Sequence, residues 1–212
     1  MISECQATCG ICSEINGSCS VDGYKELVTS KKNIISESES FLLIPSLGPL
    51  NESHIMLVPK NHSNSFASLS IAERKEAHSI LVRANNFIKN KTSRDLIFFE
   101  SGAGKRIDHS GGCIYHAHIH CVYASEAFTA ALNREIKFTP ADSFDYDIDR
   151  GYVWYMNHFG EEFACNNPLL PSQFLRYLYA NTTSIHGSWN WRRDNNIPGV
   201  LRVLKRYEDF SL

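Results

Sequence analysis

The sequence lacks a long uninterrupted hydrophobic run, although 43% of its 212 residues are hydrophobic. A transmembrane helix needs such a run. A signal peptide would need a basic start followed by an apolar stretch, but Glu4 and several cysteines occupy that region. We therefore expect a cytoplasmic protein with a sizeable buried core, built as one domain with an elaboration.

An excess of charge of either sign is also missing. The chain carries 21 Lys and Arg residues against 23 Asp and Glu residues, for a formal net charge of −2. Nonspecific binding to nucleic acid or to a membrane surface depends on an excess of basic residues. We expect neither partner, and small molecules are the default ligands.

Cysteine is plentiful, but the total of seven is odd. In a reducing compartment thiols more often bind metal or stay buried than form disulfides. Cys9 and Cys12 have the C-x-x-C spacing that can place two thiolates on one tetrahedral ion. A redox pair or two incidental thiols would also fit this spacing, and a metal site would need two further ligands.

The strongest motif is a row of alternating histidines, His116, His118 and His120. The Ala, Ile, Val and Tyr residues around them are typical of a β-strand, in which every second side chain points to the same face. We therefore expect three imidazoles along one exposed face of a sheet. Surface histidines and a three-histidine metal site are the alternatives to nucleophilic catalysis.

The remainder of the first 125 residues predicts a mixture of strands and one helix. A capping box at Ser70 and Glu73 begins a helix whose apolar residues have three-four spacing. The glycine-bearing basic loop over 100–106 favours either a close approach to phosphate or a solvated turn. Strands are predicted over 24–30, 33–45, 53–62, 95–99 and 116–123.

These motifs together resemble the histidine triad (HIT) superfamily. The family signature His-x-His-x-His-x-x is matched by residues 116–122, and the family's G-H-x-L-V-x-P-K-x-H strand is similar to residues 53–62. Many bacterial members begin with a C-x-x-C pair, matched by Cys9 and Cys12. The resemblance covers about residues 5–125. It implies an α+β fold, with an antiparallel sheet, one long helix across it and here a C-terminal extension.

The resemblance also implies an activity, that of a nucleotide hydrolase or nucleotidyltransferase. Such an enzyme attacks a nucleoside α-phosphate through a covalent histidine intermediate, on phosphoramidates, phosphoric anhydrides or dinucleoside polyphosphates. His118 would be the nucleophile, while His120 and His54 would bind the phosphate. A homodimer with a continuous sheet is implied as well. The implied nucleotide-binding residues are Ser46, Gly112, Cys113 and His120, and the implied ligands of a structural zinc are Cys9, Cys12, His62 and His116.

The chain departs from the family pattern at three places. Residues 111–113 read Gly-Gly-Cys where many members have Gly-Gln-Ser or Gly-Gln-Thr. Ser46 falls near the position at which family members have an acidic residue that holds the ribose hydroxyls. Glu100 falls at a position where they have an asparagine. Two other functions therefore stay open: a nucleotide-binding protein with little catalysis, and a metal-dependent hydrolase that uses the histidines as ligands.

The chain beyond residue 130 carries no motif of this kind. We expect a HIT-like catalytic domain over residues 1–130, with residues 131–212 packed on it as an extension. Patterns there predict a hairpin over 152–157 and 162–165, a helix over 172–180 with Pro171 at its start, and a helix over 200–207. Some polar residues of the extension could grip a substrate phosphate or base, or could be ordinary packing and solvated charge: Gln173, Arg176, Arg192 and Arg193.

Overall fold

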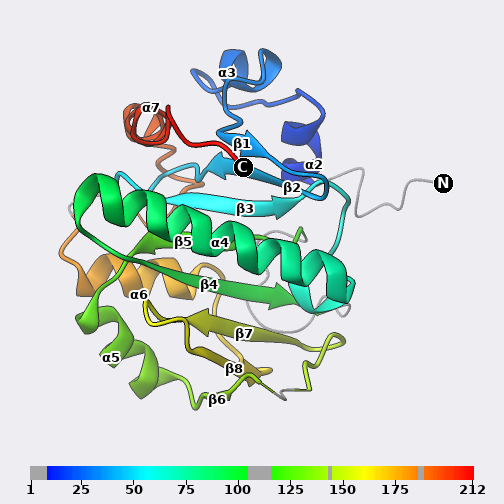
Figure 1. Cartoon of the computed structure of the whole chain (residues 1–212), viewed down its shortest axis with the longest axis vertical. Coiled ribbons are helices and arrows are strands. Elements are labelled where there is room, and N and C mark those ends of the chain that lie inside the picture. Colours follow the sequence, from blue (N-terminus) through cyan, green and yellow to red (C-terminus); the bar gives the residue numbers. More distant parts are fainter. Residues whose placement is uncertain (1–8, 105–115, 143–144, 186–188) are drawn as a thin grey trace.

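The computed structural model describes residues 9–104, 116–142, 145–185 and 189–212. Within these ranges, eight strands form one antiparallel sheet in the order β1-β2-β3-β5-β4-β7-β8-β6 (Figure 1). The predicted α+β fold with an antiparallel sheet is confirmed. The strands are β1 (Ser36–Glu37), β2 (Phe41–Pro45), β3 (Ile55–Pro59), β4 (Leu96–Ala103), β5 (Ile119–Tyr123), β6 (Thr139–Pro140), β7 (Gly151–Met156) and β8 (Glu162–Asn166).

The long helix predicted from the capping box is α4, which lies across the sheet over β3, β5 and β4 (Figure 1). The Ser70 hydroxyl accepts from the Glu73 N–H, and the Glu73 carboxylate accepts from the Ser70 N–H. No helix in the described ranges is both long and apolar enough to cross a membrane. The helices are α2 (Gly10–Ile15), α3 (Lys25–Thr29), α4 (Ile71–Thr92), α5 (Glu126–Glu135), α6 (Phe174–Thr182) and α7 (Ile197–Arg206), with the 3-10 helix η1 (Phe66–Ser68).

The sheet is buried on both faces, because separate apolar clusters cover it. On one face Leu57 and Phe98 pack with Leu81 of α4. On the other face Phe99 packs with Phe128 of α5, in the cluster that also contains buried residues of α6. The helix α6 therefore belongs to the face opposite α4, which is also the face of Phe99.

The predicted C-terminal hairpin is confirmed as β7 and β8, and it extends the same sheet. Strand β7 pairs with β4 from Phe98↔Met156 to Ala103↔Gly151. The outer side of β4 is thus occupied by this chain's own C-terminal part. The outermost strands of the described sheet are β1 and β6, of two residues each.

Several local predictions were wrong. Residues 24–30 were predicted as a strand but contain helix α3. Its N-cap residue Tyr24 and its residue Val28 are fully buried and have the four-residue spacing of a helix face. The segment 33–45 is interrupted between β1 and β2 by a turn. Helix α6 begins at Phe174, after Gln173 in a left-handed conformation, so Pro171 is not its first residue. Helix α5, begun by the Ser125 cap, was not predicted.

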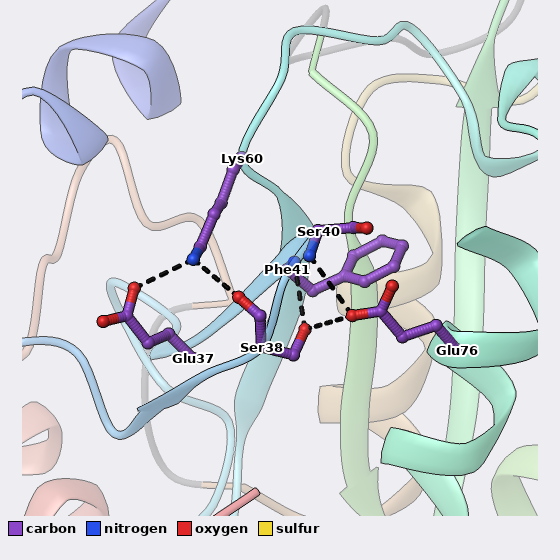
Figure 2. A network of polar contacts seen from close by, with 6 residues as sticks. All are labelled: Glu37, Ser38, Ser40, Phe41, Lys60 and Glu76. Carbon is purple, nitrogen blue, oxygen red and sulfur yellow. Dashed lines mark hydrogen bonds and ion pairs between the residues drawn. The ribbon is translucent and has the colours of Figure 1, made fainter. Parts of the chain in front are cut away.

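A polar network fixes the turn between β1 and β2 against α4 (Figure 2). The Ser38 hydroxyl and the Ser40 N–H both donate to one carboxylate oxygen of Glu76. From the other side, the Lys60 ammonium donates to the Ser38 carbonyl and pairs with Glu37 at 3.0 Å. Since Lys60 directly follows β3, the network holds the end of β3 in place two residues before His62.

Glu100 lies on β4, and not in a loop after it, because β4 continues to Ala103. Its side chain points to the face opposite that of Phe99, where its carboxylate accepts from the Phe66 N–H and the Tyr152 hydroxyl. Burial raises the pKa of Glu100 to about 7. Of the glycine-bearing basic loop predicted over 100–106, Lys105 and Arg106 lie outside the described residues.

The raised pKa of Glu100 predicts a pH-dependent stability. As the pH rises from about 4.5 to about 7, the unfolded chain ionises this carboxyl while the folded chain keeps its proton, so the free energy of unfolding falls by about 3 kcal/mol. Glu100→Gln should remove most of this decline. Urea unfolding at pH 5 and pH 7 measures it, with the exposed Glu135→Gln as the control. An unchanged slope in Glu100→Gln would refute this assignment.

Candidate active site and metal centre

Strand β5 begins only at Ile119, so His116 and His118 precede the strand. The Ala117 N–H donates to the carbonyl of Ser63 instead of joining the strand ladder. The expected exposed row of imidazoles is therefore wrong in part. His116 is fully buried, and His120 is 8% exposed.

His118 is held in one tautomer by the backbone. Its Nδ1 lies 2.8 Å from the carbonyl oxygen of His116. A carbonyl oxygen can only accept, so Nδ1 carries the proton and Nε2 keeps its lone pair. The ring therefore presents an unprotonated nitrogen, the form that can act as a nucleophile.

His120 is oriented by a second chain of hydrogen bonds. The Leu50 N–H donates to Nδ1 of His54 at 2.9 Å, which places the His54 proton on Nε2. That nitrogen lies 2.9 Å from Nδ1 of His120, which must accept. His120 therefore carries its own proton on Nε2 and can donate it to a bound ligand. The ring centroids of His118 and His120 lie 4.9 Å apart, and both residues line the same cavity.

All three imidazoles favour the neutral form. Burial is the main reason that the pKa of His118 is lowered and that the pKa values of His54 and His120 are well below the ordinary value. The positive charge of Arg176 lowers all three further. A neutral His118 keeps the lone pair that the hydrogen bonds assign to Nε2.

The four predicted metal ligands form a cluster. One ligand atom from each of Cys9, Cys12, His62 and His116 lies within 4.8 Å of the others. The sulfur of Cys12 lies 3.3 Å from Nδ1 of His62 and 3.4 Å from Nδ1 of His116. A tetrahedral zinc with ordinary bond lengths would separate sulfur and nitrogen ligands by about 3.6 Å.

The hydrogen bonds of His116 agree with a ligand role. Its Nε2 lies 2.8 Å from the Pro59 carbonyl, so Nε2 carries the proton and Nδ1 faces the thiols with a free lone pair. Burial lowers the pKa of His116 to about 4, which favours this neutral ring. Burial and the neighbouring Cys9 raise the pKa of Cys12 to about 12, the kind of cost that a bound cation removes. The donor set therefore fits a structural zinc ion.

A cavity of about 580 Å³, hereafter the histidine cavity, opens onto His118 and His120. The N-terminal part of the chain, including Cys9, forms one wall, and residues 170–176 form another. Through Cys9, the cluster of the four candidate ligands Cys9, Cys12, His62 and His116 (hereafter the metal-ligand cluster) therefore borders the same cavity as the candidate nucleophile. Its aromatic lining residues are Phe99, Phe174 and Trp191.

The predicted binding residues have different outcomes. Ser46 lines the histidine cavity and is 2% exposed, whereas Gly112 and Cys113 lie outside the described residues. From the C-terminal part, the lining includes Gln173, Arg176 and Arg192 but not Arg193. Phe99 and Ser101 also line the histidine cavity and were not among the predicted site residues. Their alternation along β4 with Glu100 was the available signal.

Comparison with known proteins identifies the family. A family model described as "Protein similar to CwfJ C-terminal" matches residues 16–137. The chain belongs to this family, which is HIT-like. No curated protein matches the chain.

Solved structures similar to this member of the CwfJ C-terminal family include three bacterial HIT proteins. A HIT-like protein from Bartonella henselae is 11% identical, with 56% of this chain and 77% of the other covered and a TM-score of 0.43. A zinc-bound histidine triad family protein from Mycobacterium smegmatis is 17% identical, with 57% and 78% covered and a TM-score of 0.43. A HIT family hydrolase from Legionella pneumophila is 17% identical, with 57% and 96% covered and a TM-score of 0.38.

The match to the CwfJ C-terminal family contains only part of the site. Ser46, His54 and the three histidines of the motif lie within residues 16–137. Cys9 and Cys12 precede this range, and the cavity wall formed by α6 follows it. In this chain, segments on either side of the family match therefore complete the metal-ligand cluster and the histidine cavity.

Proposed function

We propose that the protein is a nucleotide hydrolase or nucleotidyltransferase that attacks a nucleoside α-phosphate through a covalent intermediate on His118. The observation that carries the proposal is the hydrogen bond from His118 Nδ1 to the His116 carbonyl. It leaves the Nε2 lone pair of a neutral imidazole available, on a residue that lines the histidine cavity.

In the first step, the Nε2 lone pair forms a bond to phosphorus, and the bond between phosphorus and the leaving group breaks. The leaving group departs with that electron pair and takes a proton from solvent. The substituted His118 ring is then cationic, and its Nδ1–H remains bonded to the His116 carbonyl dipole, which stabilises the charge. Water next attacks phosphorus, the bond between phosphorus and Nε2 breaks with its electron pair returning to Nε2, and the proton lost by the water passes to solvent. In the transferase version, another acceptor replaces water.

His120 supports the same step as a hydrogen-bond donor. Because His54 donates to its Nδ1, His120 presents an Nε2–H to a phosphate oxygen. His54 is fully buried, so it acts through His120 and not on the ligand directly. Among the described residues, Ser46 is the remaining proposed contact to the nucleotide.

We further propose that Cys9, Cys12, His62 and His116 hold a structural zinc ion. Bound zinc would cross-link the N-terminal segment to the histidine motif and would take no part in the reaction. It would fix the position of His116, whose carbonyl sets the tautomer of His118. The metal-dependent hydrolase is less well supported, since the metal-ligand cluster found in the described residues includes His116 but neither His118 nor His120.

The domain division at residue 130, the homodimer and the cytoplasmic location stay predictions. The pairing of β7 with β4 bears on the homodimer. Since that side of β4 is filled, a continuous sheet built from the described strands of two copies would have to join through β1 or β6. Both have two residues, so we propose that any dimer uses helix or loop surfaces.

Adenosine 5′-phosphoramidate tests the proposed chemistry on the unmodified protein. We expect release of adenosine monophosphate, and intact mass spectrometry of samples quenched within seconds should show one adenylyl group per chain. Binding of the nucleotide without adduct or turnover would refute the enzyme and favour the nucleotide-binding protein. Turnover with no adduct under any quench would refute the covalent step.

A further inference from the structure

Arg176 is a buried cation in the wall of the histidine cavity, and 3% of it is exposed. Its guanidinium donates to the Ser46 hydroxyl oxygen at 2.9 Å, to the Gly48 carbonyl at 2.5 Å and to the Trp189 carbonyl at 2.9 Å. These bonds join α6 and the segment at Trp189 to the turn after β2. The charge is therefore fixed in position beside Ser46.

The turn after β2 packs directly on the C-terminal part. The Gly48 N–H donates to the Asn195 carbonyl at 2.8 Å. Gly48 has a φ of +59°, and a Cβ there would lie 2.7 Å from the Asp194 carbonyl oxygen. This close approach holds the turn after β2, and with it Ser46, against the C-terminal part that carries Arg176.

Arg176 lies on the same face of the sheet as His54. The Ser46 N–H donates to the His54 carbonyl, so Ser46 and His54 are neighbours across β2 and β3. His120 is one strand further, on β5. Two strand spacings place the backbone of Ser46 roughly 10 Å from the strand that carries His120. A ligand group bound at Ser46 is therefore a different group from the phosphate held at His120.

The balance of charge in the histidine cavity favours an anionic ligand. Arg176 and Arg192 both line it. The carboxylate that lines it, Glu14, is engaged by the Tyr24 hydroxyl and the Asn33 amide, and burial raises its pKa. A buried cation next to a cavity is stabilised when an anion binds there.

We propose that the Ser46 and Arg176 side of the histidine cavity binds a second anionic group of the substrate, in addition to the phosphate that His118 attacks. The inference rests on the proposed function. The second anionic group is a phosphate, carried either on the sugar or further along a phosphate chain. With this second site, a nucleotide that has two phosphates binds more tightly than a monophosphate.

Calorimetry with three adenosine nucleotides tests the proposal. Adenosine 3′,5′-bisphosphate carries the second phosphate on the sugar, adenosine diphosphate carries it on the chain, and adenosine monophosphate lacks it. We expect at least one of the first two to bind about tenfold or more tightly than the monophosphate. The tighter ligand identifies the source of the second phosphate.

Two variants show whether Arg176 causes the preference. Ser46→Asp places a carboxylate beside the guanidinium and neutralises it, and Arg176→Gln removes the charge. Either should reduce the preference to less than about threefold, while the exposed Arg202→Gln on α7 should keep it. If one variant fails to fold, the other still decides.

The outcomes distinguish a failure of the second anion site from a failure of the proposed function. Equal binding of all three nucleotides to the parent, or a preference that survives in a folded Ser46→Asp or Arg176→Gln variant, would overturn the second anion site alone. No binding of any nucleotide would overturn the proposed function, and this inference with it.

Discussion

Replacement of His118 by alanine should abolish the adenylyl adduct and lower turnover of adenosine 5′-phosphoramidate by about 10⁴-fold or more. The expected loss is large because no other described nitrogen combines a free lone pair with access to the histidine cavity. Nδ1 of His120 accepts from His54, and Nδ1 of His118 is bonded to the His116 carbonyl. Single-turnover kinetics and intact mass measure the two effects separately.

A matched control is available on α4. His78 is exposed and pairs with Glu162, away from the histidine cavity, so His78→Ala should keep full activity. His118→Gly adds a sharper test, because free imidazole in solution should restore part of the turnover without forming a protein adduct. An adduct that persists in His118→Ala would place the nucleophile on another residue.

The sequence allowed prediction of those parts of the site that depend on local spacing. The C-x-x-C pair, His62 and His116 could be assigned to one metal-ligand cluster because the family resemblance supplied the two partners that the cysteines lacked. The long helix could be predicted because the Ser70 capping box and the apolar stripe of α4 act within one element. Alternation along the strand also predicted the face of the sheet on which His120 lies. In the structure His120 pairs with Phe99 of β4, and both line the histidine cavity.

Other features depend on contacts between distant segments, which spacing alone does not encode. His116 lies before the strand and bonds through Nε2 to the Pro59 carbonyl, 57 positions away in sequence. The carbonyl of the residue held in this way sets the tautomer of His118. Arg176 reaches Ser46 from 130 positions away in sequence. Short α3 was mistaken for a strand because five residues carry too little periodicity to separate the two structures.

The second large expected effect is the loss of bound zinc and of stability when the metal-ligand cluster is disrupted. Cys12→Ser should reduce bound zinc from one ion per chain to nearly none and lower the free energy of unfolding by on the order of 5 kcal/mol. Cys12 is the sulfur that contacts both His62 and His116, so its loss removes two of the closest ligand pairs. Metal analysis of the purified protein and urea unfolding with and without a chelator measure the effect.

The same variant should also lose activity, since the cluster fixes His116 and the His116 carbonyl orients His118. Cys165→Ser, at a half-buried thiol on β8 outside the cluster, should keep zinc, stability and activity. A Cys12→Ser protein that retains one zinc per chain would exclude this ligand set. If the parent holds zinc but a chelator removes it with no change in unfolding or turnover, the ion has no structural role. A fall in stability and turnover together would show that the N-terminal segment and the nucleophile are coupled through the four-ligand cluster.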